Sequence, residues 1–246
     1  MLSKISLALL LLLTLVACNP SRVAPPRSAD YYFKEGEQFF EQQRFDDAVA
    51  SWKKVRDSYY SPELNKLAEL KIAEAHYLNQ DFISAAISYS AFAQQHPQDE
   101  RLNDVLYFLG LSYYKQMLSK DRDQTITKNA LSAFEQMLSQ FPEDKRTEEV
   151  SSLSKRCRNR LVEHEVYVGR YYLRTGEYQA AINRISQALN DFPNYYYRDE
   201  AFYYLGSAYF KNHNKKAAIA TFNQLFDQFP GSEYVLKAQY FMENNN

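Results

Sequence analysis

The sequence predicts an all-α fold in which five helix pairs form an elongated superhelical solenoid with a C-terminal capping helix. Three observations support this prediction. A small residue recurs at intervals of 37 residues, at Gly36, Ala73 and Gly110 and again at Gly169 and Gly206. An Ala follows each of them within the same copy, and a ring side chain stands three residues after each one. Apolar residues three and four apart fill the intervals, which is typical of one face of a helix.

These residue types suit two helices that cross closely. Small residues let the backbones approach, rings fill the groove beside them, and Pro stops the second helix. The clearest copy spans residues 164–193, where Gly176 occupies the turn and tolerates a positive φ. A period of about 34 residues with these residue types in this order resembles the tetratricopeptide repeat. One pair buries only part of its apolar surface, so the pairs are expected to stack.

Residues 1–17 are expected to be a signal peptide. Lys4 gives the positive start, and residues 7–16 are almost wholly apolar but too few to span a membrane comfortably. The run Leu-Val-Ala-Cys at 15–18 resembles the lipobox of bacterial lipoproteins. That resemblance implies cleavage before Cys18, a diacylglycerol on its sulfur and a further acyl chain such as palmitate on its amine, which together anchor a protein stably. The alternative is ordinary signal cleavage beside an incidental Cys.

A tether and the first three repeats are expected to follow. Residues 18–29 carry the lipid and then three Pro, and they should extend for about 30 Å. Asn19 stands next to the cysteine where an Asp would retain the protein in the inner membrane, so sorting to the outer membrane is favoured. Residues 30–142 hold repeats one to three, and the third repeat has an insertion at 119–124 between its helices.

The C-terminal half, residues 143–246, is expected to begin with one long helix. No Pro interrupts residues 143–174, and the first Gly in this stretch is Gly169. The long helix extends the first helix of repeat four backwards. Repeat five occupies 197–230, and residues 232–242 should form the capping helix that closes the open end of a solenoid.

Several runs outside the generic repeat point to one family. They are the lipobox, residues 29–32, the run 120–124 inside the insertion, His164-Glu165, Val-Gly-Arg-Tyr-Tyr-Leu at 168–173 and Ala-Ala-Ile-Asn-Arg at 180–184. Together they resemble the BamD family (YfiO/ComL) of outer-membrane assembly lipoproteins over essentially the whole mature chain. Gly169 stands where the family leads us to expect Ala, and this exchange should change little.

The resemblance implies a non-catalytic subunit of the β-barrel assembly machinery. Family members bind the POTRA domains of the barrel subunit BamA, work beside other assembly-machine lipoproteins, and help unfolded outer-membrane proteins to fold and insert. The expected location is the outer membrane, with a lipid anchor and the folded part facing the periplasm. The alternative is a periplasmic repeat-scaffold lipoprotein for pilus or cell-wall assembly, which should lack the insertion and the runs between 164 and 184.

First-helix positions that face the concave surface of such an array supply a candidate groove for a substrate peptide. They are mostly apolar with scattered carboxylates, which suits an extended peptide with alternating apolar side chains, such as the aromatic-ended last strand of a barrel protein. The alternative for each ring is that it packs on the next repeat. The candidate groove residues are Phe33, Glu37, Phe40, Leu70, Glu74, Tyr77, Tyr107, Leu111 and Tyr114.

The C-terminal half is the candidate docking surface for BamA. Arg170, Arg174 and Arg184 lie on the predicted helices of repeat four. Guanidinium groups bind carboxylates with two parallel hydrogen bonds. We expect these arginines to contact acidic groups of the partner, an assignment that combines family analogy with charge.

No catalytic, metal or cofactor site is expected. The four His are scattered, and His164-Glu165 begins like a zinc-protease motif but has Val168 where the second His would stand. A Gly-rich phosphate loop and a nucleophile elbow are missing from the sequence. An enzyme would need a convergent polar site, and the sequence offers none.

Charge and cysteine content give little further direction. The net charge of −1 does not favour a nucleic-acid partner. If Cys18 carries lipid, Cys157 has no partner for an intramolecular disulfide. Cys157 lies in the basic run 155–160, which is either a solvated helix face or a docking site for an acidic partner.

Overall fold

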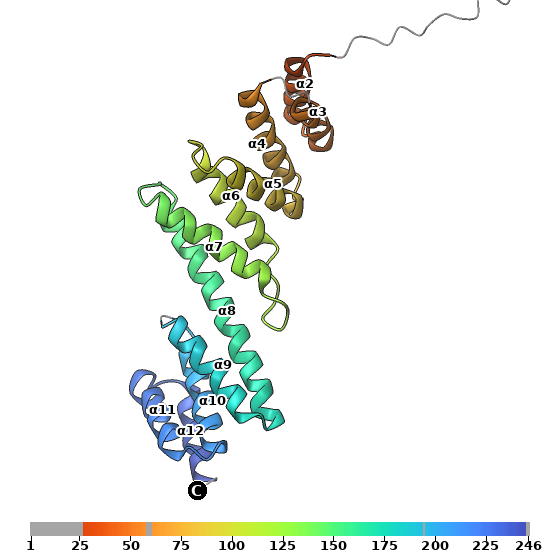
Figure 1. Ribbon diagram of the computed structural model, residues 1–246. Helices are drawn as coiled ribbons and strands as arrows, with labels where there is room; N and C mark the ends of the chain where they lie inside the picture. Colours follow the sequence, from red (N-terminus) through yellow and green to blue (C-terminus); the bar gives the residue numbers. More distant parts are fainter. Residues whose placement is uncertain (1–26, 58–60, 194, 245–246) are drawn as a thin grey trace, which may run out of the picture.

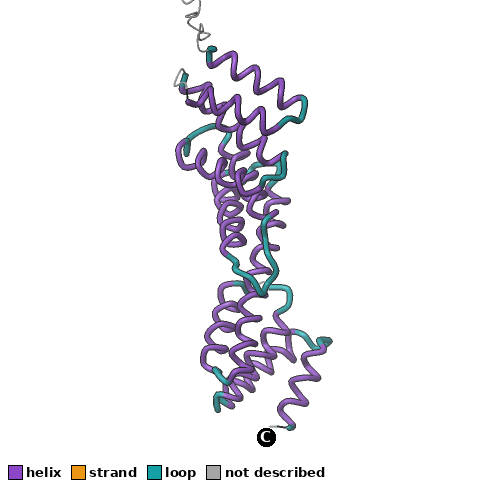
Figure 2. The backbone as a smooth tube through the Cα atoms, turned by 90° about the vertical axis from the view of Figure 1, so that its right-hand side faces the viewer, coloured by secondary structure: helices purple, strands orange, loops and turns teal. Residues whose placement is uncertain are grey.

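The computed structural model describes residues 27–57, 61–193 and 195–244. All regular secondary structure within these ranges is α-helical, which confirms the predicted fold class. The leader, Cys18 and most of the expected tether lie outside the described residues. Figure 1 shows an elongated stack of helix pairs with the first and last pairs at opposite ends, and Figure 2 shows the same stack from the side.

The helices follow the predicted pairs, and each second helix returns antiparallel to the first. A last helix, α12, covers the fifth pair. The bounds are α2 Ala29–Glu41 and α3 Phe45–Asp57, α4 Pro62–Leu78 and α5 Phe82–Gln95, α6 Leu102–Lys115 and α7 Thr125–Gln140, α8 Thr147–Thr175 and α9 Tyr178–Asp191, α10 Arg198–Lys211 and α11 Lys215–Gln228, and α12 Glu233–Glu243.

The turns inside four of the pairs share one geometry. Gly176 has φ 85°, and Gln43, Gln80 and His213 occupy the equivalent places with φ 59–60°. The amide after each of these residues donates to the carbonyl five positions earlier, so the left-handed residue closes the first helix. Gly176 therefore does what its place in the sequence predicts, while the other three turns hold L side chains in a conformation that favours Gly.

The pairs cross closely because small residues stand where the helices meet. A Cβ atom added to Gly169 would lie 2.4 Å from Cγ1 of Ile185 on α9. Gly110 is as close to Phe134, where the distance would also be 2.4 Å. An Ala at 169 would displace Ile185, so the exchange is less neutral than the sequence suggested.

Three hydrophobic clusters run along the stack. The first joins α2, α3 and α4, the second extends from α4 to α8, and the third extends from α8 to α12. The long helix α8 belongs to two of them: Val150, Cys157 and Leu161 lie in the second cluster, and Val162 and Val166 lie in the third. The two halves of the molecule are thus joined along one continuous helix (Figure 1).

The long helix begins at Thr147, four residues later than predicted. The reason is a polar turn in front of it. Asp144 accepts a hydrogen bond from the backbone amide of Arg146 at 2.8 Å and two more from its guanidinium at 2.8 and 2.7 Å. Asp99 and Arg101 make the same three bonds in front of α6, at 3.0, 2.7 and 2.8 Å. One turn type therefore starts both helices.

Candidate peptide groove and partner-docking surface

The first repeat contributes less to the candidate groove than its sequence predicts. Phe33 is only 8% exposed, and its carbonyl accepts a hydrogen bond from the Trp52 indole at 3.2 Å. Phe33 is therefore a core residue, which corrects its assignment to the groove. The Phe40 ring is half-buried, with its centroid 5.5 Å from that of Phe45 and 5.6 Å from that of Trp52. Glu37 remains exposed.

The second and third repeats bring the remaining groove candidates onto one half-buried surface. Leu70, Tyr77, Tyr107, Leu111 and Tyr114 are packed against the second cluster from the outside. Each of these side chains therefore combines a packed face with an accessible one. A peptide could contact the accessible faces without any rearrangement of the core.

A cleft lies between α4 and α6 within this surface. Leu70 and Glu74 line it, and its volume is about 290 Å³. Tyr89, Val105, Arg101, Asp104 and Phe108 complete the lining. Arg101, Asp104 and Phe108 are not among the groove residues predicted from the sequence. The signal that could have found them is the Asp99–Arg101 turn, because its recurrence at 144–146 fixes which face of α6 turns toward the neighbouring pair.

A polar network borders the groove where α6 meets α8. The Tyr107 hydroxyl donates to Glu149 at 3.0 Å, and the Arg146 guanidinium lies 4.6 Å above the Tyr107 ring. Arg146 also pairs with Asp104 at 2.7 Å and with Asp144 at 2.7 Å. Burial, followed by the bond to Glu149, raises the pKa of Tyr107 to about 12, so its hydroxyl stays protonated. The hydrogen bonds from Arg146 hold the pKa of Asp144 well below its usual range.

Two of the three candidate docking arginines already have carboxylate partners. Arg170 donates to Glu200 at 3.0 Å and stacks over the Tyr204 ring at 4.6 Å. Arg184 donates to Glu165 at 3.1 Å. Arg174 makes no ion pair with any residue that the structure describes, and it lies exposed in the last turn of α8. Each paired arginine keeps further N–H donors, but Arg174 is the most available cation of the three.

The insertion folds against α8. The carbonyl of Lys120 lies 2.7 Å from Nδ1 of His164, and Arg160 donates to the carbonyl of Leu118. Gln124 is 4% exposed and donates to the carbonyls of Ser119 and Arg122, both at 2.9 Å. These contacts hold the loop at the middle of the long helix.

Three of the runs that carry the family resemblance meet in space. Residues of the insertion, of His164-Glu165 and of the 180–184 run line one polar cleft of about 420 Å³ between α7, α8 and α9. His164 contacts the carbonyl of Lys120 in the inserted loop. This contact gives the His-Glu pair a structural role. In the described ranges no three His, Cys, Asp or Glu side chains gather closely enough to hold a metal ion.

The second cysteine is enclosed. Cys157 is 0% exposed, its sulfur lies 3.8 Å from that of Met117, and burial raises its pKa to about 12. A protonated, enclosed thiol is a poor nucleophile. The described helices include none with the length and apolar character that a membrane span needs.

Comparisons with known proteins find similar chains among curated sequences and among solved structures. The curated BamD of Caulobacter vibrioides is 22% identical over 70% of this chain, and the alignment spans 57% of that protein. The BamD of Neisseria gonorrhoeae is 24% identical over 80% of each chain. Among solved structures, the TPR2AB domain of yeast Sti1 matches 88% of this chain at 15% identity with a TM-score of 0.43.

One family profile covers most of the described helices. It is the profile of YfiO, described as an outer membrane lipoprotein, and it matches residues 26–217. The match includes the insertion and the long helix, which distinguish this solenoid from a generic repeat array, and it extends past α10. The chain belongs to the YfiO family of outer membrane lipoproteins, that is, the BamD family.

Proposed function

We propose that this chain is a non-catalytic subunit of the β-barrel assembly machinery of the outer membrane. It is anchored there by lipid on Cys18, with the helical solenoid in the periplasm. The observation that carries the proposal is the joint presence of the insertion, the long helix and the 164–184 runs, within a family match over residues 26–217. A Cys18→Ser chain that still fractionated with membranes would contradict the anchor.

The N-terminal repeats, residues 30–142, form the substrate half in this proposal. Segments of unfolded outer-membrane proteins bind along α4 and α6, where Tyr77, Tyr107 and Leu111 present half-buried apolar faces. The cleft beside Leu70 accepts one side chain of such a segment. A fluorescent peptide with alternating aromatic residues should bind this surface, and Leu111→Asp should weaken the binding. Equal affinity of the variant would contradict the groove.

The C-terminal half, residues 143–246, docks the POTRA region of BamA in this proposal. Arg174 is the first contact, because it is exposed and has no carboxylate partner among the described residues. Arg170 and Arg184 contribute their remaining donors while Glu200 and Glu165 hold them in place. Other lipoproteins of the machinery bind elsewhere on the solenoid.

The test is binding of the immobilised mature chain to the purified POTRA region of BamA from the same cell. We expect saturable binding that weakens with salt, and Arg174→Glu should reduce the affinity roughly tenfold. Lys34→Glu, at an exposed site on α2 in the other half of the chain, is the matched control and should bind normally. No binding by a folded, lipidated chain would favour the repeat scaffold for pilus or cell-wall assembly. If charge reversal at all three arginines left binding unchanged, the docking surface would lie elsewhere on the chain.

A further inference from the structure

The first half of α8 is the first helix of a pair whose second helix is missing. The turns at 99–101 and 144–146 are alike bond for bond, so they set α6 and α8 in one register, offset by 45 residues. The positions that face the preceding pair match in burial. Val105 corresponds to Val150, which are 1% and 0% exposed, and Ser112 corresponds to Cys157, both 0% exposed.

The positions that should face a second helix do not match. On α6 they are Leu106 and Gly110, and Gly110 lies against Phe134 of α7. The corresponding residues on α8 are Ser151 and Lys155, and both are exposed. Polar side chains therefore occupy the face of α8 that an α7-like helix would otherwise cover.

Further along α8, the same side of the helix is covered. Gly169 lies 14 residues after Lys155, about 40° short of four full turns, so both residues point to the same side. At Gly169 that side meets Ile185 of α9. The helix α9 then runs back along α8 and ends at Asp191, and Pro193 prevents its continuation. Beyond its end the face of α8 is open.

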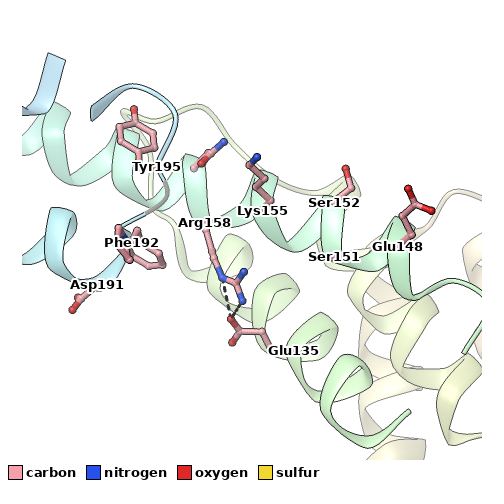
Figure 3. Close-up of a pocket in the computed structure, with 11 residues that line it drawn as sticks. Glu135, Glu148, Ser151, Ser152, Lys155, Arg158, Asp191, Phe192 and Tyr195 are labelled. Carbon is pink, nitrogen blue, oxygen red and sulfur yellow. Dashed lines mark hydrogen bonds and ion pairs between the residues drawn. The ribbon is translucent and has the colours of Figure 1, made fainter. Parts of the chain in front are cut away.

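A cleft occupies this open position. Its volume is about 990 Å³, and its floor is α8 from Glu148 to Asn159. One wall is α7 at Glu135, and the end wall is formed by Asp191, Phe192, Pro193 and Tyr195 (Figure 3). A helix about 10 Å wide fills about 420 Å³ per turn, so the cleft has room for roughly two turns.

The charged side chains that line the cleft indicate which charges a bound segment should carry. Arg158 on its floor is paired with Glu135 at 2.7 Å. Lys155, Glu148 and Asp191 make no ion pair within the described part of the chain, and the carbonyl end of α9 adds a partial negative charge beside Asp191. Lys155, which has no ion pair among the described residues, thus lies between the carboxylates of Glu148 and Asp191 (Figure 3).

We propose that this cleft binds a short helix of a partner protein, which lies along α8 in the place of the missing second helix. The partner helix carries an acidic residue opposite Lys155 and basic residues toward Glu148 and Asp191. This site goes beyond the proposed function: it lies in the C-terminal half but uses neither the groove nor the three docking arginines. It also explains why the basic run on α8 faces a hollow at Lys155 rather than open solvent.

The first experiment uses photo-crosslinking residues at Ser151 and at Asn159 of the full chain in its own cells. These positions are eight residues apart, about 12 Å along α8. A helical occupant should be captured by the two probes at residues about eight apart. An extended segment would be captured three or four residues apart, since a strand rises about 3.3 Å per residue. That shorter separation, or capture no stronger than with a probe at Lys216, would overturn the proposal.

The second experiment measures affinity for the captured segment as a synthetic peptide. Lys155→Glu should weaken binding roughly tenfold, and exchange of the matching acidic residue of the peptide for Lys should restore it. Ser151→Trp should block the cleft, whereas Lys216→Glu should have no effect. Ser151, Lys155 and Lys216 are all exposed, so the variants should melt like the parent chain. Unchanged binding by both Lys155→Glu and Ser151→Trp would overturn the site.

Discussion

The two stretches of α8 have the same secondary structure but different neighbours. The stretch after residue 162 is covered by α9, and its contact residue is Gly169. The stretch before it packs on the third helix pair on one side only, and its corresponding residue is Lys155. A solenoid can therefore keep the register of its first helices while it omits a second helix. The omission then leaves a shaped, polar surface.

The largest expected effect tests whether the paired stretch carries more of the stability. Ile185 is 0% exposed and lies against Gly169, so Ile185→Ala should lower the free energy of unfolding by about 3 kcal/mol. Ser151→Ala, in the unpaired stretch, should change it by less than about 0.5 kcal/mol. Urea denaturation of both variants measures the difference. Equal losses would mean that the two stretches are not energetically distinct.

The next effect concerns the turn that starts the unpaired stretch. Asp144→Asn removes the charge-assisted bonds to Arg146 and should cost about 2 kcal/mol at neutral pH. Because the pKa of Asp144 is lowered in the folded protein, its contribution is complete above pH about 4 and is lost as the pH falls further. The difference from the parent chain should therefore shrink in acid. Denaturation at several pH values checks this, with the exposed Glu143→Gln as control. A difference that did not vary with pH would contradict the ion pair.

The smallest expected effect concerns Gly169 and Lys155, which occupy corresponding positions on α8. Gly169→Ala places a methyl group against Ile185 and should lower the free energy of unfolding by about 1 kcal/mol. Lys155→Ala meets open space and should be neutral or slightly stabilising, since Ala has the higher helix propensity. Thermal melts of the two variants measure both changes. A stable Gly169→Ala chain would show that α9 can retreat from α8.

The sequence predicts the parts of the fold that depend on local patterns. The recurring small residues place the helix crossings, and Gly176 places the turn between α8 and α9. The start of α8 differs from the sequence prediction because the bonds between Asp144 and Arg146 form only in the folded turn, and a helical pattern alone does not reveal them. A comparison with Asp99 and Arg101 would have corrected it.

The candidate site was harder to predict because its availability depends on neighbours distant in the sequence. Phe33 has the spacing of a groove residue, yet Trp52 encloses it. Arg170 has the charge of a docking residue, yet Glu200 comes 30 positions later and pairs with it. The cleft on α8 becomes visible only when the missing second helix is recognised. At corresponding positions α6 has Gly110 and α8 has Lys155, and this difference is the sequence signal for the cleft.

Because α8 is continuous, it also acts as a spacer between the two halves. Its 29 residues span about 43 Å, so the separation between the two halves is set by the helix length alone. An insertion of seven residues would lengthen α8 by about 10 Å and turn the distal half by only about 20°. An insertion of two residues would lengthen it by only about 3 Å but turn the distal half by about 160°. The distance between the two binding halves and their relative rotation can thus be changed separately, by the number of residues inserted into or deleted from α8.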